Sequence, residues 1–327
     1  MRLKETINQF KSRKIVVVGD VIADQFLYGA ISRVSREAPV FILRHEQTET
    51  LPGGAANAAL NVAALGARCI LLGIVGADET GRKIADVLKA KGVETKFLVH
   101  SKDWQTTTKT RIFAGQPHAP RQQVIRVDYE NEKPLAAEIQ TEMIRNLHSA
   151  SENADAIIVS DYNYGAASER VGGELRNVGL KKNIPVFVDS RFRLTDFAGA
   201  TAATPNEDEV EEVLRKQFKT VSELKTAAAE LREKLQLQAL LVTRGKNGMI
   251  LFDDGKTPQH FPVIGSQDAV DVTGAGDTVM AAFALAAASG ATFAEAATLA
   301  NHAGGLVVMK RGTATVSEKE LLNSILS

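Results

Sequence analysis

The chain has 327 residues, of which 44% are hydrophobic and 24% charged, and 39 basic residues balance 39 acidic ones. This composition is that of a folded globular protein, and a net charge of zero gives no overall attraction to nucleic acid or to an anionic membrane. The single cysteine, Cys69, excludes an internal disulfide and a cysteine-rich metal site. Because the N-terminal residues lack the apolar stretch of a signal peptide, we expect a cytoplasmic protein.

Apolar β-branched runs alternate with helical periodicity along the chain. Strands are predicted at residues 14–19, 69–75, 156–160, 185–189 and 239–243. Helices are predicted near residues 55–65, 80–91, 138–149, 168–182 and 221–235, with a core helix over 279–289. This alternation is typical of an α/β fold with a mostly parallel sheet covered by helices on both faces.

Residues 25–45 and 104–128 interrupt the alternation. Both segments contain short extended pieces with no helix between them. We therefore expect a small antiparallel sheet that is inserted into the main fold and closes over a site as a lid. No repeat or long linker separates parts of the sequence, so we expect one domain over residues 1–327.

The motif D-V-T-G-A-G-D at residues 271–277 places a carboxylate beside two glycines, directly before an apolar helix. Gly274 and Gly276 allow a tight turn in which backbone N–H groups point at one anion. Asp277 would repel a phosphate held there, so its position makes sense if it accepts a proton from an attacking hydroxyl. The alternative is an aspartate that merely caps a helix after a glycine turn.

Two common nucleotide motifs are absent from the sequence. It contains no G-x-x-x-x-G-K-[ST], and the first predicted strand runs into G-D-V-I-A-D instead of G-x-G-x-x-G. These absences argue against a P-loop enzyme and against an NAD-dependent enzyme.

Four motifs occur in the order found in the ribokinase-like (PfkB) carbohydrate kinases, which the chain resembles over nearly its whole length. They are P-G-G-A-A-N at 52–57, T-P-N-E-D-E at 204–209, T-R-G-K-N-G at 243–248 and D-V-T-G-A-G-D at 271–277. The resemblance implies a three-layer α/β/α fold with a β lid. It also implies transfer of the γ-phosphoryl group of ATP to a sugar hydroxyl.

A narrower resemblance rests on G-D-V-I-A-D, S-R-V-S-R-E-A-P-V and V-S-D-Y. These segments are similar to the kinase domain of bacterial enzymes that phosphorylate C1 of D-glycero-D-manno-heptose 7-phosphate in ADP-heptose biosynthesis. Bifunctional members add a nucleotidyltransferase domain with an H-x-G-H motif, which this chain lacks, so we expect the kinase part alone. Tyr164 and Arg191 stand where that subfamily has lysines. Alternatives are a kinase for another small sugar or a nucleoside, and a nucleotide-binding regulator without turnover.

The resemblance also implies roles for single residues. Asp277 would be the general base, and the backbone N–H groups of Gly274, Ala275 and Gly276 would hold the γ-phosphate. ATP and Mg²⁺ would be bound by Asn206, Glu209, Thr243, Arg244, Gly245, Gly248, Asn301 and Ala303, with Glu209 acting on magnesium through water. A monovalent cation such as K⁺ would lie at Asp271 and Thr273. The sugar would contact Asp20, Asp24, Gly53, Gly54, Asn57, Lys109, Arg111 and Arg191.

Plainer interpretations stay open for several of these motifs. G-G-A-A-N also suits a tightly packed helix start, N-E-D-E an acidic first helical turn, and R-G-K-N-G a surface turn. Arg126 and Arg193 are further candidates for binding an anion, or ordinary solvated charges. We expect a sugar or sugar phosphate as the partner, no nucleic acid or membrane, and a homodimer formed through the lid, because lids pair between subunits in related kinases.

Overall fold

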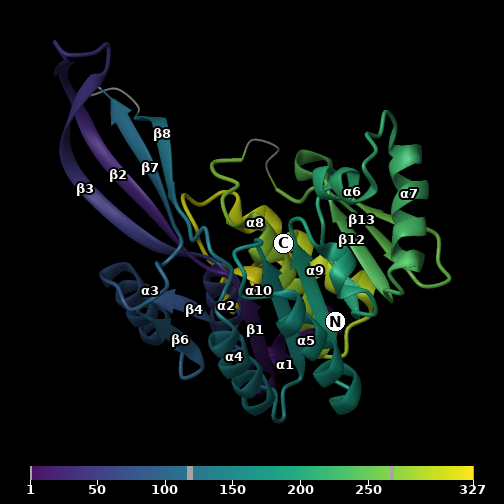
Figure 1. Ribbon diagram of the computed structural model, residues 1–327. Coiled ribbons are helices and arrows are strands. Elements are labelled where there is room, and N and C mark those ends of the chain that lie inside the picture. Colours follow the sequence, from purple (N-terminus) through teal and green to yellow (C-terminus); the bar gives the residue numbers. More distant parts are fainter. Residues whose placement is uncertain (1, 116–120, 266–268, 327) are drawn as a thin grey trace.

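The computed structural model describes residues 2–115, 121–265 and 269–326, which form a helix-covered main sheet and a second sheet that projects from it (Figure 1). The main sheet has the strand order β14-β13-β12-β11-β10-β9-β1-β4-β5, with β6 paired to β4. Its strands are β1 (Lys14–Gly19), β4 (Arg68–Gly76), β5 (Val93–Glu94), β6 (Leu98–Ser101), β9 (Ala156–Asp161), β10 (Val186–Ser190), β11 (Ala202–Ala203), β12 (Ala239–Thr243), β13 (Met249–Asp253) and β14 (Gln259–Phe261). Pairing is parallel from β12 to β5, and β13 and β14 add an antiparallel edge.

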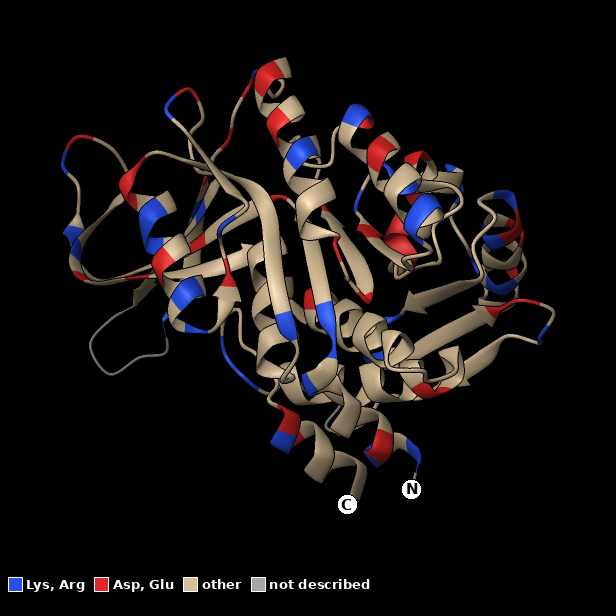
Figure 2. Ribbon diagram, turned by 90° about the horizontal axis from the view of Figure 1, so that it is seen from below, with Lys and Arg blue, Asp and Glu red and all other residues tan. Residues whose placement is uncertain are grey.

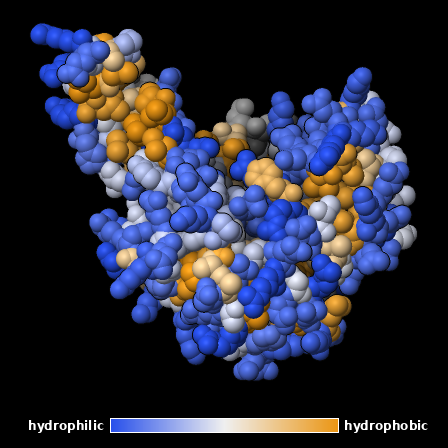
Figure 3. Space-filling model, viewed as in Figure 1, coloured by the Kyte–Doolittle hydropathy of each residue, from blue (hydrophilic) through white to orange (hydrophobic). Residues whose placement is uncertain are grey.

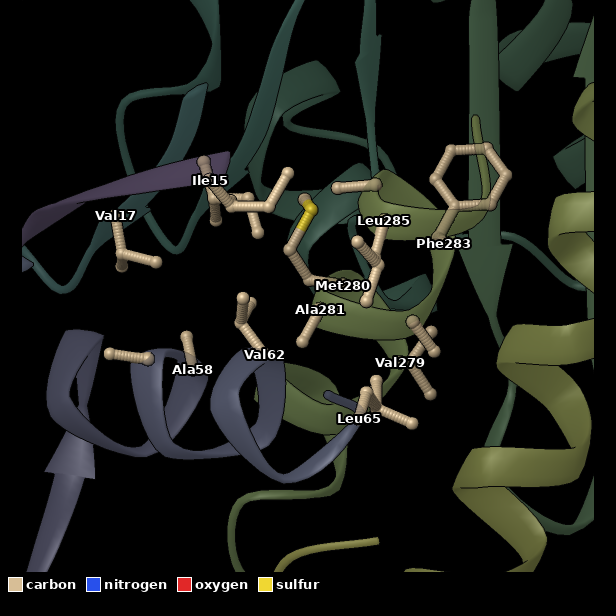
Figure 4. Close-up of a cluster of buried hydrophobic side chains, with 14 of the residues drawn as sticks. Ile15, Val17, Ala58, Val62, Leu65, Val279, Met280, Ala281, Phe283 and Leu285 are labelled. Carbon is tan, nitrogen blue, oxygen red and sulfur yellow. The ribbon is translucent and has the colours of Figure 1, made fainter. Parts of the chain in front are cut away.

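Alternate side chains of β1 enter two different hydrophobic cores. Ile15 and Val17 pack on one face of the sheet, where Figure 4 shows them beside α2 and α8. Val16 and Val18 belong to the core on the other face. Because successive residues of a strand point to opposite faces, a continuous apolar run such as K-I-V-V-V-G requires helices on both sides.

The helices divide between these two cores. The core that holds Ile15 is covered by α1 (Arg2–Gln9), α2 (Ala55–Ala64), α3 (Glu79–Ala90), α8 (Ala275–Ala288), α9 (Phe293–Val307) and α10 (Glu318–Leu326). The opposite core is covered by α4 (Ala137–Ala150), α5 (Glu169–Lys182), α6 (Glu207–Leu214) and α7 (Val221–Lys234). Short 3₁₀ helices span Phe10–Ser12, Leu194–Phe197 and Gly245–Asn247. The predicted three-layer α/β/α fold is confirmed, and the core helix starts four residues earlier than predicted.

The second sheet has the order β3-β2-β7-β8 and is formed by β2 (Val21–Val34), β3 (Phe41–Gly54), β7 (Thr108–Gly115) and β8 (Gln122–Tyr129). We call it the lid. Two details of the prediction were wrong: β2 and β3 are 14 residues long instead of short, and β2 pairs with β7 in parallel. Both strands extend beyond the predicted segment, since only one residue separates β2 from β1 and β3 continues until α2 begins.

The two faces of the lid differ in chemistry. Asp24 lies opposite Lys109 in the β2–β7 register, and Lys109 places its ammonium 5.8 Å from the ring centre of Tyr162 in the main fold. This polar face is therefore the inner one. The outer face carries Ile125 and Val127, which are exposed, and Figure 3 shows hydrophobic side chains gathered on the projecting lid.

The two ends of the described chain lie close together, since α1 packs against α10 (Figure 2). Basic and acidic side chains are interspersed over the ribbon in this view, as expected for a chain with no net charge. In the part of the chain that the structure describes, none of the helices has the length and apolar character needed to cross a bilayer.

Candidate active site

The predicted phosphate cradle lies at the start of α8, on the edge of the main sheet from which the lid projects. Gly274 is the N-cap residue and adopts a left-handed conformation with φ 74° and ψ 10°. A Cβ atom at this position would lie 2.4 Å from Nδ2 of Asn57, so only glycine fits. The N–H of Ala275 donates to the carbonyl of Val272 at 3.2 Å, so in this conformation it is not free to bind a phosphate.

Asp277 lies in the first turn of α8 and is almost completely buried. Burial raises the pKa of this carboxyl to about 7, although hydrogen bonds from Asn57 and Tyr162 act in the opposite direction. Nδ2 of Asn57 donates to Oδ2 at 2.8 Å, and the hydroxyl of Tyr162 donates to Oδ1 at 3.2 Å. A carboxylate with a pKa near neutrality suits a general base, because it can both accept and release a proton.

Two cavities meet at this helix start, of about 390 and 230 Å³. The larger lies between the β12–β13 connection and α9, and the smaller extends toward the ends of β9 and β10. Both are lined by Thr243, Val272, Ala275 and Gly276. This is the position where an open α/β sheet binds ligands, beyond the carboxyl ends of its parallel strands.

The larger cavity brings together several residues predicted to bind the nucleotide. Thr243, Gly245, Gly248 and Asn301 line it. Gly248 has φ 78°, and a Cβ atom there would lie 2.0 Å from the carbonyl oxygen of Phe261.

Two predicted nucleotide contacts are not at this cavity. Ala303 is fully buried in the hydrophobic core, and α9 instead presents Gly304 and Gly305 to the cavity. The side chain of Arg244 is mostly buried in an ion pair with Glu207 of α6, with Nε and Oε1 2.7 Å apart. The guanidinium therefore connects the loop after β12 to α6.

Asn206 and Glu209 form a capping box at the start of α6. Oδ1 of Asn206 accepts the Glu209 N–H, and Oε2 of Glu209 accepts the Asn206 N–H, both at 2.8 Å. A helix cap thus accounts for part of the N-x-x-E motif. Both residues also line the smaller cavity, so the cap places the Glu209 carboxylate at that cavity.

Asp189 is a second acidic residue of the smaller cavity, and the sequence analysis did not single it out. Burial raises the pKa of Asp189 and of Glu209, and the charge of Glu209 raises that of Asp189 further. Oγ1 of Thr204, which also lines the cavity, is buried without a hydrogen-bond partner. Carboxylates and a free hydroxyl suit Mg²⁺, which prefers oxygen ligands. Over the described ranges, however, no three acidic, histidine or cysteine side chains converge tightly enough to hold a metal alone.

On the lid side, Asp24 and Arg111 form a mostly buried ion pair. A Cβ atom on Gly53 would lie 2.2 Å from Oδ2 of Asp24, so this glycine makes room for the carboxylate. Gly54 has φ 55°, and a Cβ atom there would lie 2.6 Å from the carbonyl oxygen of Asp20. The P-G-G segment thus brings β3 close to Asp24 and to the start of β2.

Asp20 does not fit its predicted role as a sugar ligand. Its two carboxylate oxygens accept N–H groups from Tyr162, Tyr164 and Ala166 at 2.8 to 3.0 Å. Burial nevertheless raises its pKa to about 6. Through these hydrogen bonds the carboxylate of Asp20 fixes the loop after β9.

Asn57 also departs from its predicted sugar contact. Nδ2 donates to Asp277 and to the carbonyl of Gly274, and Oδ1 accepts from Asn61. The side chain of Asn57 is thus hydrogen-bonded to Gly274 of the cradle, to Asp277 and to Asn61 of its own helix.

Lys109 lies between two aromatic rings on the inner face of the lid. Its ammonium is 5.8 Å from the ring centre of Tyr162 and 5.3 Å from that of Tyr164. Burial lowers its pKa, and Arg191 and Arg126 lower it further, whereas the carboxylates of Asp128 and Asp24 act in the opposite direction. Because Asp128 pairs with Arg126 and Asp24 with Arg111, Lys109 and Arg191 are the cations that could attract an anion here.

The remaining predicted side chains have these positions. Arg191 is exposed at the smaller cavity, Arg126 pairs with Asp128, and Arg193 binds Asp196 and the Ala167 carbonyl. Asp271 accepts the N–H groups of Thr273 and Gly312, both at 2.9 Å, and these bonds lower its pKa. Asp271 thereby ties the cradle to the segment before α10.

Tyr162 and Lys246 also belong to this region, although the sequence analysis gave them no role. Tyr162 binds Asp277, and Lys246 lines the larger cavity. Tyr162 follows the predicted strand 156–160 by two residues, and Lys246 lies inside T-R-G-K-N-G. Each residue follows the end of a predicted strand, and this position in the sequence could have indicated that it lies near the ligand.

The open α/β sheet and the buried carboxyl beside two cavities are typical of an α/β enzyme that binds its ligands beyond the strand ends, and comparisons with known proteins identify the family. Residues 12–320 match the model of the "pfkB family carbohydrate kinase". The "Bifunctional protein HldE" of Aeromonas hydrophila is 40% identical over 326 residues, which cover 99% of this chain and 66% of that protein. The HldE of Gluconobacter oxydans is 38% identical over 322 residues, with 98% and 66% coverage. The chain thus spans about two thirds of these relatives.

Solved structures show the same fold at low sequence identity. Phosphofructokinase-2 from Escherichia coli, in complex with potassium, has a TM-score of 0.79 at 18% identity and covers 96% of this chain and 98% of that one. Arabidopsis thaliana ribokinase, complexed with ribose and ATP, has a TM-score of 0.73 at 22% identity with the same coverage. The chain belongs to the pfkB family of carbohydrate kinases, phosphotransferases whose acceptor is a sugar hydroxyl.

Proposed function

We propose that the chain is an ATP-dependent sugar kinase in which Asp277 is the general base. The observation that carries this proposal is a buried carboxyl with a pKa of about 7 at a helix start where two cavities meet. The adenosine part of ATP would occupy the larger cavity, and its γ-phosphate would lie at the start of α8. There the helix N-terminus attracts the negative charge of the phosphate.

In the proposed reaction Asp277 takes the proton from the sugar hydroxyl as the oxygen attacks the γ-phosphorus. The O–H bond of the sugar breaks, a new P–O bond forms, and the bond between the γ-phosphorus and the β–γ bridging oxygen breaks to release ADP. The glycines of the cradle allow close approach of the phosphate. Catalysis then depends mainly on position and on charge stabilisation, as is general for phosphoryl transfer. The inner face of the lid would exclude water, which competes with the sugar as acceptor.

Magnesium fits the smaller cavity, where Asp189, Glu209 and Thr204 offer oxygen atoms. When bound with ATP, Mg²⁺ neutralises charge on the transferred phosphate. We expect these residues to hold it largely through water. A monovalent cation near Asp271 and Thr273 stays a prediction, as does one domain over residues 1–327.

The substitution Asp277→Asn tests the role of the base. It keeps the size of the side chain, and the new amide can still accept from Asn57 and donate to the hydroxyl of Tyr162, but the proton acceptor is removed. We expect kcat to fall by about 10² to 10⁴, while ATP binding, measured by calorimetry, stays within a few-fold. A variant with nearly full turnover would exclude Asp277 as the base.

For the acceptor we propose a phosphorylated sugar, D-glycero-D-manno-heptose 7-phosphate, phosphorylated at C1. Two observations support it: the relatives at 38% and 40% identity carry the name HldE, and Lys109 and Arg191 bring positive charge to one region of the site. Tyr164, in place of a lysine, contacts Lys109. Lys109 would therefore supply the charge for the sugar phosphate.

ADP release over a panel of sugars tests this acceptor. We expect heptose 7-phosphate to be preferred over the unphosphorylated heptose, fructose 6-phosphate and ribose. Lys109→Gln should raise KM for the phosphorylated heptose by roughly 10- to 100-fold, the effect of one lost charged hydrogen bond. The same rise for an unphosphorylated sugar would contradict the assignment of Lys109.

We also propose that the chain forms a homodimer through the outer face of the lid. Ile125 and Val127 in the edge strand β8 are 54% and 37% exposed, and Val34 and Phe41 at the far end of the lid are 56% and 59% exposed. Several exposed apolar side chains on one projecting sheet favour a protein–protein contact. A second copy of the chain would bury the same surface on both subunits.

A further inference from the structure

Asp277 is held from two sides by donors from distant parts of the chain. Asn57 belongs to α2, whereas Tyr162 directly follows β9. We propose that Asn57 and Tyr162 are positioning residues that orient Asp277 and decide which of its oxygen atoms receives the proton from the substrate. This proposal rests on the proposed role of Asp277 as the base. We call the pair the Asn57–Tyr162 clamp.

The amide of Asn57 can face Asp277 in only one orientation. Nδ2 of Asn61 donates to Oδ1 of Asn57 at 3.2 Å, and Oδ1 of Asn61 in turn accepts the hydroxyl of Thr278 at 3.1 Å. This chain of bonds fixes the oxygen of Asn57 toward its own helix, so its NH₂ group points at Asp277. All of these side chains are buried, where an unpaired amide would be costly.

Asn57 also connects the base to the phosphate cradle. Nδ2 donates to Oδ2 of Asp277 at 2.8 Å and to the carbonyl oxygen of Gly274 at 3.3 Å. One amide therefore fixes the carboxylate and the left-handed turn relative to each other. A shift of Asn57 would disturb both the proton acceptor and the position of the phosphate.

The two donors differ in what they tolerate after the proton has moved. The amide NH₂ of Asn57 can only donate, so a proton on Oδ2 of Asp277 would face another donor. The hydroxyl of Tyr162 can rotate and accept, so a proton on Oδ1 keeps a partner. The proton from the sugar hydroxyl therefore goes to Oδ1.

Burial and a neighbouring acidic group raise the pKa of Asp277, whereas the two residues of the clamp lower it. Asp24 from β2 raises the pKa of Asp277, in addition to burial, and Asp189 at the end of β10 is close enough for its own pKa to be raised by Asp277. Asn57 and Tyr162 lower the pKa of Asp277. Without either donor the carboxylate becomes harder to ionise, and activity should begin at a higher pH.

Tyr162→Phe tests the clamp, with Tyr164→Phe as the matched control. Both substitutions remove one hydroxyl and keep a ring beside Lys109, but the Tyr164 hydroxyl binds Glu130 instead of Asp277. We expect the acid limb of kcat/KM against pH to move up by about one pH unit in Tyr162→Phe. The limb should stay in place in Tyr164→Phe. Equal shifts in both variants, or none in either, would overturn the proposal.

Asn57→Ala separates positioning from sugar binding. A positioning residue predicts a lower kcat and a displaced acid limb with KM for the sugar nearly unchanged. A sugar ligand predicts the reverse, a raised KM with the limb in place, and would overturn this part of the proposal.

A measurement that does not depend on turnover distinguishes failure of the clamp from failure of the proposed function. ¹³C NMR of enzyme labelled in its aspartate carboxyls, with Asp277 assigned by its absence in Asp277→Asn, reports the pKa directly. A raised pKa in Tyr162→Phe supports the clamp even if no sugar is turned over. An unchanged pKa in an active enzyme refutes the clamp and leaves the function standing.

Discussion

The conformation of Gly274 gives the sharpest prediction, because one added methyl group should disturb both the fold and the site. Gly274 has φ 74°, a region that residues with a Cβ rarely adopt. The added atom would also lie 2.4 Å from Nδ2 of Asn57. In Gly274→Ala the amide must move away from Asp277, from the Gly274 carbonyl, or from both.

The expected loss of stability is the sum of two effects. The left-handed conformation costs a residue with a side chain about 1–2 kcal/mol. Loss of a hydrogen bond to a charged group adds about 1.5–3 kcal/mol. Together they give roughly 2.5–5 kcal/mol, which corresponds to a fall in Tm of about 5–20 °C at 2–4 °C per kcal/mol.

Gly290→Ala is the matched control for this experiment. Gly290 has φ 88° just after α8, but a Cβ atom there would meet nothing within 4 Å. Gly290→Ala should therefore lose only the stability that the left-handed conformation costs, a fall in Tm of about 2–8 °C. Thermal unfolding and ADP release are measured on both variants, and we expect kcat to fall by at least about 10²-fold only in Gly274→Ala. If Gly274→Ala has the same Tm as Gly290→Ala and keeps its turnover, the proposed clash between the added Cβ atom and Asn57 is refuted.

Three further predictions concern the pH profile, stability and assembly. Since the pKa of Asp277 is about 7, kcat/KM of the native enzyme should rise with pH through about 7 and level off above it; a profile flat from pH 5 to 9 would contradict this. The native carboxyl binds its proton more tightly than the unfolded one, so its contribution to stability falls as pH rises from about 4 to 7. Asp277→Asn should therefore raise Tm relative to the native protein more at pH 8 than at pH 5, and a larger gain at pH 5 would be the wrong sign. Ile125→Lys should lower the mass seen in sedimentation to that of a monomer, whereas Leu180→Lys, an exposed apolar position on α5, should not; a monomeric native protein would exclude the lid dimer.

The alternation of strands and helices could be predicted because each buried strand is an unbroken apolar run and each helix has a periodic one. β1 shows this, since Ile15 to Val18 are all apolar and are buried on both faces of the sheet. The lengths of β2 and β3 could not be predicted in the same way. β3 is buried only at its last three residues, and β2 is mostly buried, without a regular alternation, as far as Ala30 and exposed at its last three residues, so neither strand shows a clear hydrophobic pattern along its length.

The hydrogen bonds and ion pairs that side chains of the site make with residues distant in sequence could not be predicted. Asn57 and Asp277 are 220 residues apart in sequence, so nothing local indicates that the amide binds the carboxylate. Arg244 is a similar case, since its partner Glu207 lies on another helix. Residues whose role depends on the backbone alone, such as Gly274 and Gly248, could be recognised more readily, because a glycine at a required turn is visible in the sequence.

Two strands of the lid, β2 and β3, join the main fold with at most one residue between elements, so the lid can act as a lever arm. Strands of 14 residues extend roughly 46 Å at 3.3 Å per residue, so a rotation of about 10° at their base would move the tip by roughly 8 Å. The base of β3 is Gly53 and Gly54, directly before the helix that carries Asn57. We therefore expect a motion of the lid tip, or its capture by a second subunit, to reach Asn57, whose amide donates to Asp277. Distance measurements between a label at the tip and one on α7 would report this motion as substrate binds.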